Sequence, residues 1–176
     1  MRAPLAVAAL SFALAAPGHA CSLVSTPHAL DPQEQKVDHK APAKAEASLA
    51  RIVRGKGPVP HDDGSVSLTS CDDIGSIVLA LKSVPLDDRT PADKLGYRIV
   101  LVDGELPKGA SLPTNATRDL TPENELTFFW SDGATDEQDP IDFALAVVAV
   151  DLAGNESEPS APVRVRHSGK KDEPHC

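Results

Sequence analysis

The stretch DFALAVVAVDLAGNESEPSAPVRV, residues 142–165, decides the fold. Its residues 143–150 form an apolar run that is too short to span a membrane and long enough for a buried strand. Residues 151–157 are rich in the side chains that favour turns. Valine then alternates with arginine over residues 163–166, which puts one face of a second strand in the core and the other in water. The sequence therefore predicts a strand, a tight turn and a second strand.

Other segments show the alternation of apolar side chains that is typical of strands. They are separated by loops rich in proline, glycine and aspartate, and they cover residues 48–53, 76–84, 97–102 and 126–130. The alanines of residues 41–50 would also allow a short helix, residues 55–70 read as a long loop, and any strand within 105–122 should be short and at an edge. We therefore expect an all-β fold, an antiparallel β-sandwich of about seven strands over residues 47–167.

The inward positions of these strands predict the core, because alternate residues of a strand share one face. We expect Phe128 and Trp130 to contribute the largest side chains there. The residues expected between the two sheets are Ile77, Leu79, Tyr97, Ile99, Phe128, Trp130, Val147 and Ala149.

Residues 149–157, AVDLAGNES, resemble the end of the penultimate strand and the following turn of fibronectin type III and bacterial immunoglobulin-like domains. Tyr97, within the sequence GYRIVLV, is similar to the third strand of those modules. The chain departs from their pattern at Leu145, where a tyrosine is common, and at residues 77–81, where Ile and Leu replace a tryptophan. The resemblance implies an immunoglobulin-like (fibronectin type III-like) sandwich and an extracytoplasmic, non-enzymatic module that spaces, adheres or binds.

The N-terminal residues predict export. Residues 1–20 combine the positive Arg2, an apolar run and a small-residue cleavage pattern ending at Ala20, which is typical of a secretory signal peptide. The short alanine-rich leader favours a bacterial protein that is secreted, periplasmic or on the cell surface. Residues 21–46 are polar and favour a linker or tether, and residues 168–176 read as a polar tail. No other apolar run could cross a bilayer, so we expect no transmembrane segment in the mature chain.

The charge of the chain disfavours two classes of partner. Removal of Arg2 with the leader would leave 16 basic against 26 acidic residues, a net charge of −10. Such a chain repels nucleic acid and anionic membrane surfaces. Aromatic residues make up 3% of the sequence, which also disfavours a platform that stacks bases or sugars.

The acidic loop SDGATDEQDPID, residues 131–142, is the one candidate for chemistry. It carries five carboxylates and no Lys or Arg. Calcium prefers several oxygen ligands, which loops at the end of a sandwich can supply, whereas the alternative is a loop that its charge keeps solvated. We expect no catalytic residue and no other cofactor. The predicted calcium ligands are Asp132, Asp136, Glu137 and Asp139.

Three cysteines remain after cleavage at Ala20, and in an exported protein at least two should pair. We favour Cys71–Cys176, because Cys71 precedes the second predicted strand and the C-terminal tail is long enough to reach back to it. The alternative is Cys21–Cys71. Cys21 also stands where bacterial lipoproteins are acylated, although Gly18 replaces the leucine usual in their signal, so lipidation of Cys21 competes with a free or bonded thiol.

These features predict a secreted or surface-exposed, non-enzymatic module with a structural, adhesive or protein-binding role toward an extracytoplasmic protein or envelope component. The alternative is an extracytoplasmic inhibitor or binding protein that uses the acidic loop against a basic partner.

Overall fold

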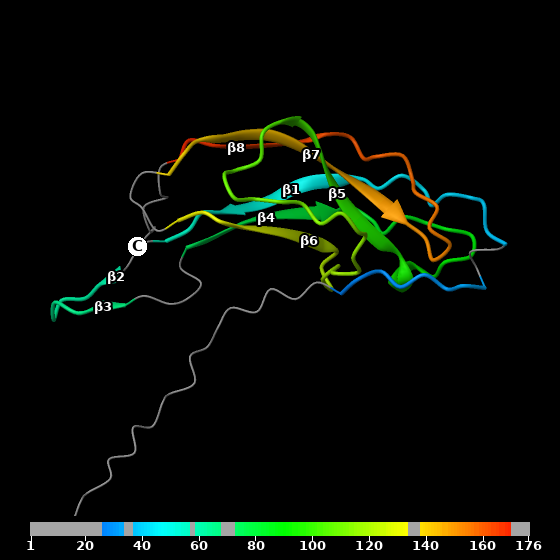
Figure 1. The fold of residues 1–176 in the computed structure, drawn as a ribbon, viewed down its shortest axis with the longest axis horizontal. Coiled ribbons are helices and arrows are strands. Elements are labelled where there is room, and N and C mark those ends of the chain that lie inside the picture. Colours follow the sequence, from blue (N-terminus) through cyan, green and yellow to red (C-terminus); the bar gives the residue numbers. More distant parts are fainter. Residues whose placement is uncertain (1–25, 34–36, 57–58, 68–72, 134–137, 170–176) are drawn as a thin grey trace, which may run out of the picture.

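The chain is all-β. The computed structural model describes residues 26–33, 37–56, 59–67, 73–133 and 138–169. Six of its strands form two antiparallel sheets of three strands each (Figure 1). One sheet has, in order, β1 (Ala47–Val53), β4 (Ile74–Leu81) and β6 (Glu125–Ser131). The other has, in order, β5 (Gly96–Gly104), β7 (Ile141–Val150) and β8 (Val163–His167).

Two small elements accompany the sheets. A short hairpin of two-residue strands, β2 (Val59–Pro60) and β3 (Val66–Ser67), projects beyond one end of the sheets (Figure 1). A 3₁₀ helix covers Ala92–Lys94 in the connection from β4 to β5. Within the described residues, no helix is long and apolar enough to cross a membrane.

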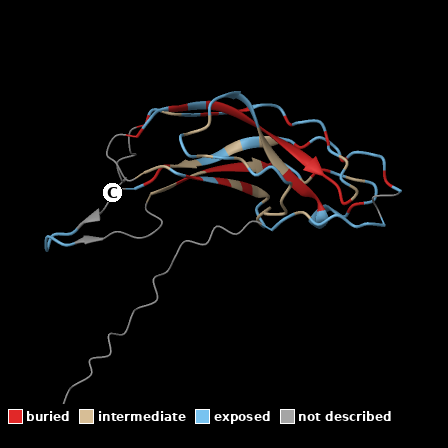
Figure 2. Ribbon diagram, viewed as in Figure 1, coloured by how far each residue is buried: buried red, intermediate tan, exposed pale blue. Residues whose placement is uncertain are grey.

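Buried side chains from both sheets form one hydrophobic core, which is densest along the middle strands β4 and β7 (Figure 2). The register brings the predicted inward positions together, with Ile77 opposite Phe128 and Tyr97 opposite Ala149. Seven of the eight predicted core residues are buried, and the eighth, Ile99, is partly buried and packs against the same core. The prediction of the core from alternation is confirmed.

Trp130 is accommodated by a glycine on the neighbouring strand. Gly75 stands opposite Trp130 in the register of β4 and β6, and a Cβ added there would lie 2.4 Å from an indole carbon. The indole therefore lies across the backbone of β4 and is 4% exposed. Phe128 stacks beside it with ring centroids 6.0 Å apart.

The strand β7 is buried on both faces, but β8 pairs only with its first half, over residues 141–145. Two serines complete the ladder of its second half. The backbone N–H of Ser160 donates to the carbonyl of Val147 while its hydroxyl accepts the N–H of Val147, at 2.9 and 3.0 Å. Ser157 does the same for Ala149. The serine hydroxyls thus replace carbonyls of a pairing strand, which satisfies β7 where a proline-rich segment runs beside it.

The connection between the last two strands is longer than the predicted tight turn. A turn closes between Asp151 and Asn155, with Gly154 at a φ of +89° that favours glycine. Residues 156–162 then run along β7 before β8 begins. The reason is the pair of serines, whose hydrogen bonds hold this segment against β7 without strand geometry.

Three other local expectations meet different outcomes. Residues 47–53 form the predicted strand, β1, and the short helix that residues 41–50 would also allow is absent, because these residues of β1 pair with β4. The predicted loop 55–70 includes the β2–β3 hairpin. Over residues 105–122, where any strand was expected to be short and at an edge, the structure has no strand, and Thr117 forms isolated bridges with Tyr97 and Pro27.

The polar segment expected to be a linker packs against the sheets in its described parts, residues 26–33 and 37–46. Asp38 and Ala45 are 4% and 1% exposed. His28 donates its backbone N–H to the carbonyl of Ala116, and its Nε2 lies 2.6 Å from the carbonyl oxygen of Asp151. Separate hydrogen bonds and single buried side chains hold this segment in place. It therefore needs no continuous apolar face and shows no apolar periodicity in its sequence.

Candidate functional site

Two clusters of polar side chains, each built around a buried aspartate, lie at opposite ends of the sheets. The first, the Asp132 cluster, consists of Arg54, Asp132, Gln138 and His167. Arg54 directly follows β1, Asp132 follows β6, Gln138 precedes β7 and His167 ends β8. Three parts of the chain that are far apart in sequence, at residues 54, 132–138 and 167, therefore meet at one end of the fold.

Arg54 and Asp132 form a buried, two-pronged ion pair, with both side chains 5% exposed. Nε of Arg54 donates to Oδ2 at 2.8 Å, and one of its terminal nitrogens donates to Oδ1 at 2.9 Å. Three further donors complete the carboxylate: the backbone N–H of Gly55 at 2.7 Å, the indole N–H of Trp130 at 3.0 Å and Nε2 of Gln138 at 3.0 Å. Five donors occupy the lone pairs of Asp132, so it can bind a metal or a proton only by breaking this network.

The electrostatics of the cluster follow from these contacts. Burial acts to raise the pKa of Asp132, but the hydrogen bonds from Arg54, Gly55 and Trp130 together with the charge of Arg54 outweigh it, so the pKa is lowered. The remaining terminal nitrogen of Arg54 lies 3.1 Å from Nδ1 of His167, and the N–H of Gly169 donates to the same Nδ1 at 3.1 Å. That Nδ1 must accept, which selects the tautomer with the proton on Nε2.

The structure divides the predicted calcium ligands of the acidic loop. Asp132 is committed to Arg54, and Asp142, a further carboxylate of this loop, pairs with Arg164 and Arg166. Asp139 is exposed, while Asp136 and Glu137 lie outside the described residues. A pocket of about 650 Å³ opens beside the loop. Calcium binding by the loop as a whole stays a prediction, now without an open Asp132.

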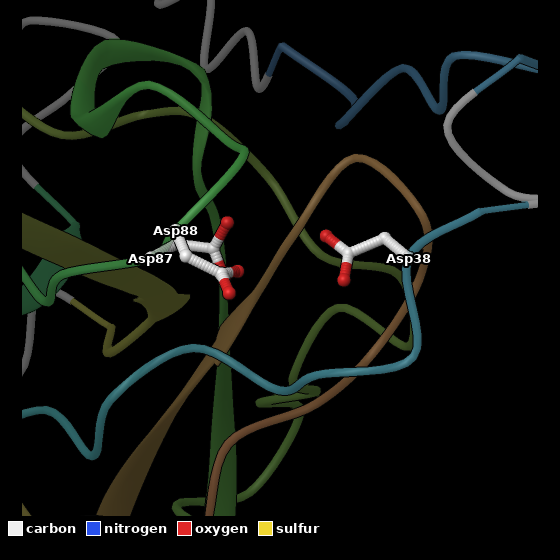
Figure 3. Close-up of side chains that lie close together, drawn as sticks. All are labelled: Asp38, Asp87 and Asp88. Atoms are coloured by element: carbon white, nitrogen blue, oxygen red, sulfur yellow. The ribbon is translucent and has the colours of Figure 1, made fainter.

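The second group, the Asp38 cluster, consists of Asp38, Asp87 and Asp88. Asp38 comes from the segment before β1, and the other two come from the loop between β4 and β5. One carboxylate oxygen of each lies within 4.8 Å of the others, and the three side chains point toward one another (Figure 3). This juxtaposition was not predicted, because each aspartate is surrounded in the sequence by the polar residues of an ordinary loop.

The three carboxylates of the Asp38 cluster have only a few ion-pair and hydrogen-bond partners among the described residues. Nζ of Lys40 lies 3.0 Å from Oδ2 of Asp88, in a pair where both side chains are largely exposed. Oδ1 of Asp87 accepts the backbone N–H groups of Arg89 and Thr90, but its Oδ2 is buried and has no hydrogen-bond partner in the described part of the chain. Asp38 is buried, and its Oδ1 accepts the backbone N–H of Lys40 at 3.1 Å.

A smaller pocket of about 400 Å³ lies between the outer edges of β5 and β6. Tyr97 lines it, is 2% exposed, and its hydroxyl has no partner among the described residues. Burial raises the pKa of Tyr97 to about 12, so the phenol is neutral at ordinary pH.

The cysteine predictions cannot be placed. Cys21, Cys71 and Cys176 lie outside the described residues. The pairing Cys71–Cys176, its alternative Cys21–Cys71 and lipidation of Cys21 therefore stay predictions.

No known protein-family model matches the chain, and no curated protein proves similar to it.

Proposed function

We propose that the chain is an immunoglobulin-like β-sandwich module that acts outside the cytoplasm by binding a protein, without catalysis. The pair of three-stranded sheets is the architecture on which this proposal rests. The leader and the net negative charge support export and a protein partner in preference to nucleic acid.

The order of the strands supports the immunoglobulin-like topology. If β1, β4 and β5 are taken as strands A, B and C, and β6, β7 and β8 as E, F and G, the sheet orders are A-B-E and C-F-G. Constant-type immunoglobulin sandwiches have these two sheets with a strand D beside E. Among the described residues no strand occupies that position beside β6, so the fold proposed is a six-stranded variant with an open edge.

The proposed binding surface is the outer edge of β5. Tyr97 exchanges two backbone hydrogen bonds with Thr117 on this side, at 2.7 and 2.9 Å. Beyond it, no described residue forms backbone hydrogen bonds with the outer edge of β5. Leu101 and Val102 follow there and are 40% and 49% exposed. An edge strand with free N–H and carbonyl groups and exposed apolar side chains can accept an added strand from a partner.

The acidic loop supports the alternative, an inhibitor of a basic partner, less well. Its Asp132 and Asp142 are already in ion pairs with arginines of the same chain. A basic partner would have to compete with those pairs for the charge.

The test uses lysine substitutions on the edge. Leu101→Lys and Val102→Lys add charge to the proposed pairing edge, as natural edge strands do to prevent pairing. Leu86→Lys is the matched control, because Leu86 is exposed in the loop between β4 and β5. We expect wild type and the control to capture one stoichiometric partner from an extracytoplasmic extract, and the two edge variants to lose it. Equal capture by all four proteins would refute the edge as the binding site.

Export is tested separately by intact-mass analysis of the native protein. We expect an N-terminus at Cys21, and an acyl mass there would establish lipidation. A native protein that retains Met1 would contradict the proposed location. The same measurement counts the disulfides.

A further inference from the structure

We propose that the Asp38 cluster binds a calcium ion that ties the segment before β1 to the loop between β4 and β5. This inference concerns a different part of the molecule from the β5 edge and from the acidic loop.

The first observation is the buried carboxylate of Asp38. The residue is 4% exposed, and its side chain points toward Asp87 and Asp88 (Figure 3). Within the described residues, the backbone N–H of Lys40 is the one hydrogen-bond donor to this carboxylate, and no Lys, Arg or His forms an ion pair with it. A buried charge without a counter-ion is costly, and a cation beside Asp38 would offset that cost.

The second observation is independent of how many acids are present. Oδ2 of Asp87 is shielded from solvent and lacks any donor, whereas Oδ1 of the same carboxylate takes two backbone N–H groups. Those two bonds hold the carboxylate in place, and the side chain of Asp87 points toward Asp38 (Figure 3). Most buried polar atoms in native structures have a hydrogen-bond partner, so we expect this oxygen to bind a ligand that the described residues do not supply.

Distance and charge both suit a divalent ion. Two oxygens that share one calcium lie at most twice the Ca–O distance apart, about 4.6–5.2 Å. The three carboxylates offer oxygens within 4.8 Å of one another. Three negative charges against the one charge of Lys40 leave a net charge of −2. Lys40 itself is 71% exposed and can turn away into solvent.

The ligand chemistry selects calcium among divalent ions. The cluster is all-oxygen, with no histidine or cysteine, which disfavours zinc. Three carboxylates on two loop segments suit the variable geometry of calcium better than the strict octahedron of magnesium. Waters would complete the coordination shell, so the dissociation constant should be in the range of extracellular modules, about 10⁻⁴–10⁻³ M.

The site would join segments that already touch. The N–H of Ala43 donates to the carbonyl of Leu86 at 2.8 Å, and the amide of Asn155 donates to the carbonyl of Asp38 at 3.2 Å. Calcium would add a bond between segments 49 residues apart in sequence, since Asp38 and Asp87 are its ligands. It would thereby hold the segment 37–46 on the sheets.

The experiment compares the melting temperature of the mature protein in chelator, in about 10 mM calcium and in the same concentration of magnesium. Isothermal titration calorimetry measures calcium binding directly. At ten to a hundred times the dissociation constant, binding should raise the melting temperature by about 4–10 °C. Asp87→Asn and Asp38→Asn should weaken calcium binding at least tenfold and abolish the shift. Both are close isosteres, and fluorescence of the single tryptophan, Trp130, checks that they fold.

Two matched controls locate the site. Asp93→Asn changes an exposed carboxylate of the 3₁₀ helix, and Asp139→Asn changes the acidic loop; both should keep the calcium shift. Loss of the shift in Asp139→Asn, with Asp87→Asn unaffected, would assign calcium to the acidic loop and overturn the proposal. A melting temperature that calcium leaves unchanged, or that magnesium raises equally, would overturn it as well.

Discussion

The Asp132 cluster and the Asp38 cluster place buried carboxylates at opposite ends of the same sheets, and they differ in what meets the charge. Asp132 has a paired arginine and three further donors, all from the chain. Among the residues that the structure describes, Asp38 has one backbone N–H as donor, and Asp87 beside it has an oxygen with no donor. A buried aspartate carboxylate therefore has all its hydrogen bonds at one end of the sheets and lacks some of them at the other.

The difference teaches where to look for an external ligand. A buried polar group costs stability unless it is paired, so a fully paired carboxylate is explained by the fold and an incompletely paired one is not. A pocket of about 650 Å³ lies beside the satisfied cluster, next to the acidic loop in which the sequence predicted a calcium site. The unsatisfied oxygen, Oδ2 of Asp87, lies instead in a loop whose sequence contains no recognisable ligand motif.

The largest effect should come from breaking the satisfied cluster. Asp132→Ala leaves Arg54 buried without its partner and should lower the free energy of unfolding by about 3–5 kcal/mol in urea denaturation. Asp139→Ala, an exposed change in the same loop, is the control and should stay within about 0.5 kcal/mol of wild type. A loss below about 1 kcal/mol for Asp132→Ala would show that the ion pair is open to water.

Acid should weaken the same cluster. Because the pKa of Asp132 is lowered in the folded state, its contribution is present above the ordinary carboxyl pKa of about 4 and is lost as pH falls through the lower folded value. Urea unfolding of wild type between about pH 5 and pH 2 should show this loss. Asp132→Asn should have a flatter pH profile over that range, and identical slopes for the two proteins would count against the assignment.

The Asp38 cluster should respond in the opposite sense. In metal-free buffer Asp87→Asn removes one of the crowded negative charges while its side-chain oxygen can still accept from Arg89 and Thr90. We expect the free energy of unfolding to rise by about 1 kcal/mol. Asp132→Asn, measured beside it, should lose stability. If both variants are destabilised alike, the two clusters do not differ as described.

Tyr97 should give the smallest effect, since its hydroxyl is uncharged and has no hydrogen-bond partner within the described ranges. Tyr97→Phe should change the free energy of unfolding by less than about 1 kcal/mol, because a hydroxyl with no bond has little to lose. Tyr97 is the single tyrosine, so an absorbance titration reports it alone. Its phenolate should form near pH 12 in the folded protein and near pH 10 once unfolded. A folded titration near pH 10 would mean that Tyr97 is solvated.

The strands and most of the core were predictable because their signal is local. Alternation along residues 126–130 and 97–102 decides which side chains point inward, and pairing with a neighbour leaves that choice unchanged. The ladder made by Ser157 and Ser160 was missed, since serine next to proline reads as a turn, and only the proximity of β7 converts the hydroxyls into acceptors.

The sequence by itself determined an all-β chain, the inward residues of its strands and its net negative charge, since these depend on composition and on spacing of two residues. Tertiary structure alone decided how the carboxylates are used. Arg54 meets Asp132 across 78 residues, and Asp38 meets Asp87 across 49, so no spacing in the sequence marks either pair. Asp132 is buried with an arginine and three further donors, whereas Asp38 is buried with one donor among the described residues. The two differ because the free energy of a charged group depends on the donors that folding brings to it.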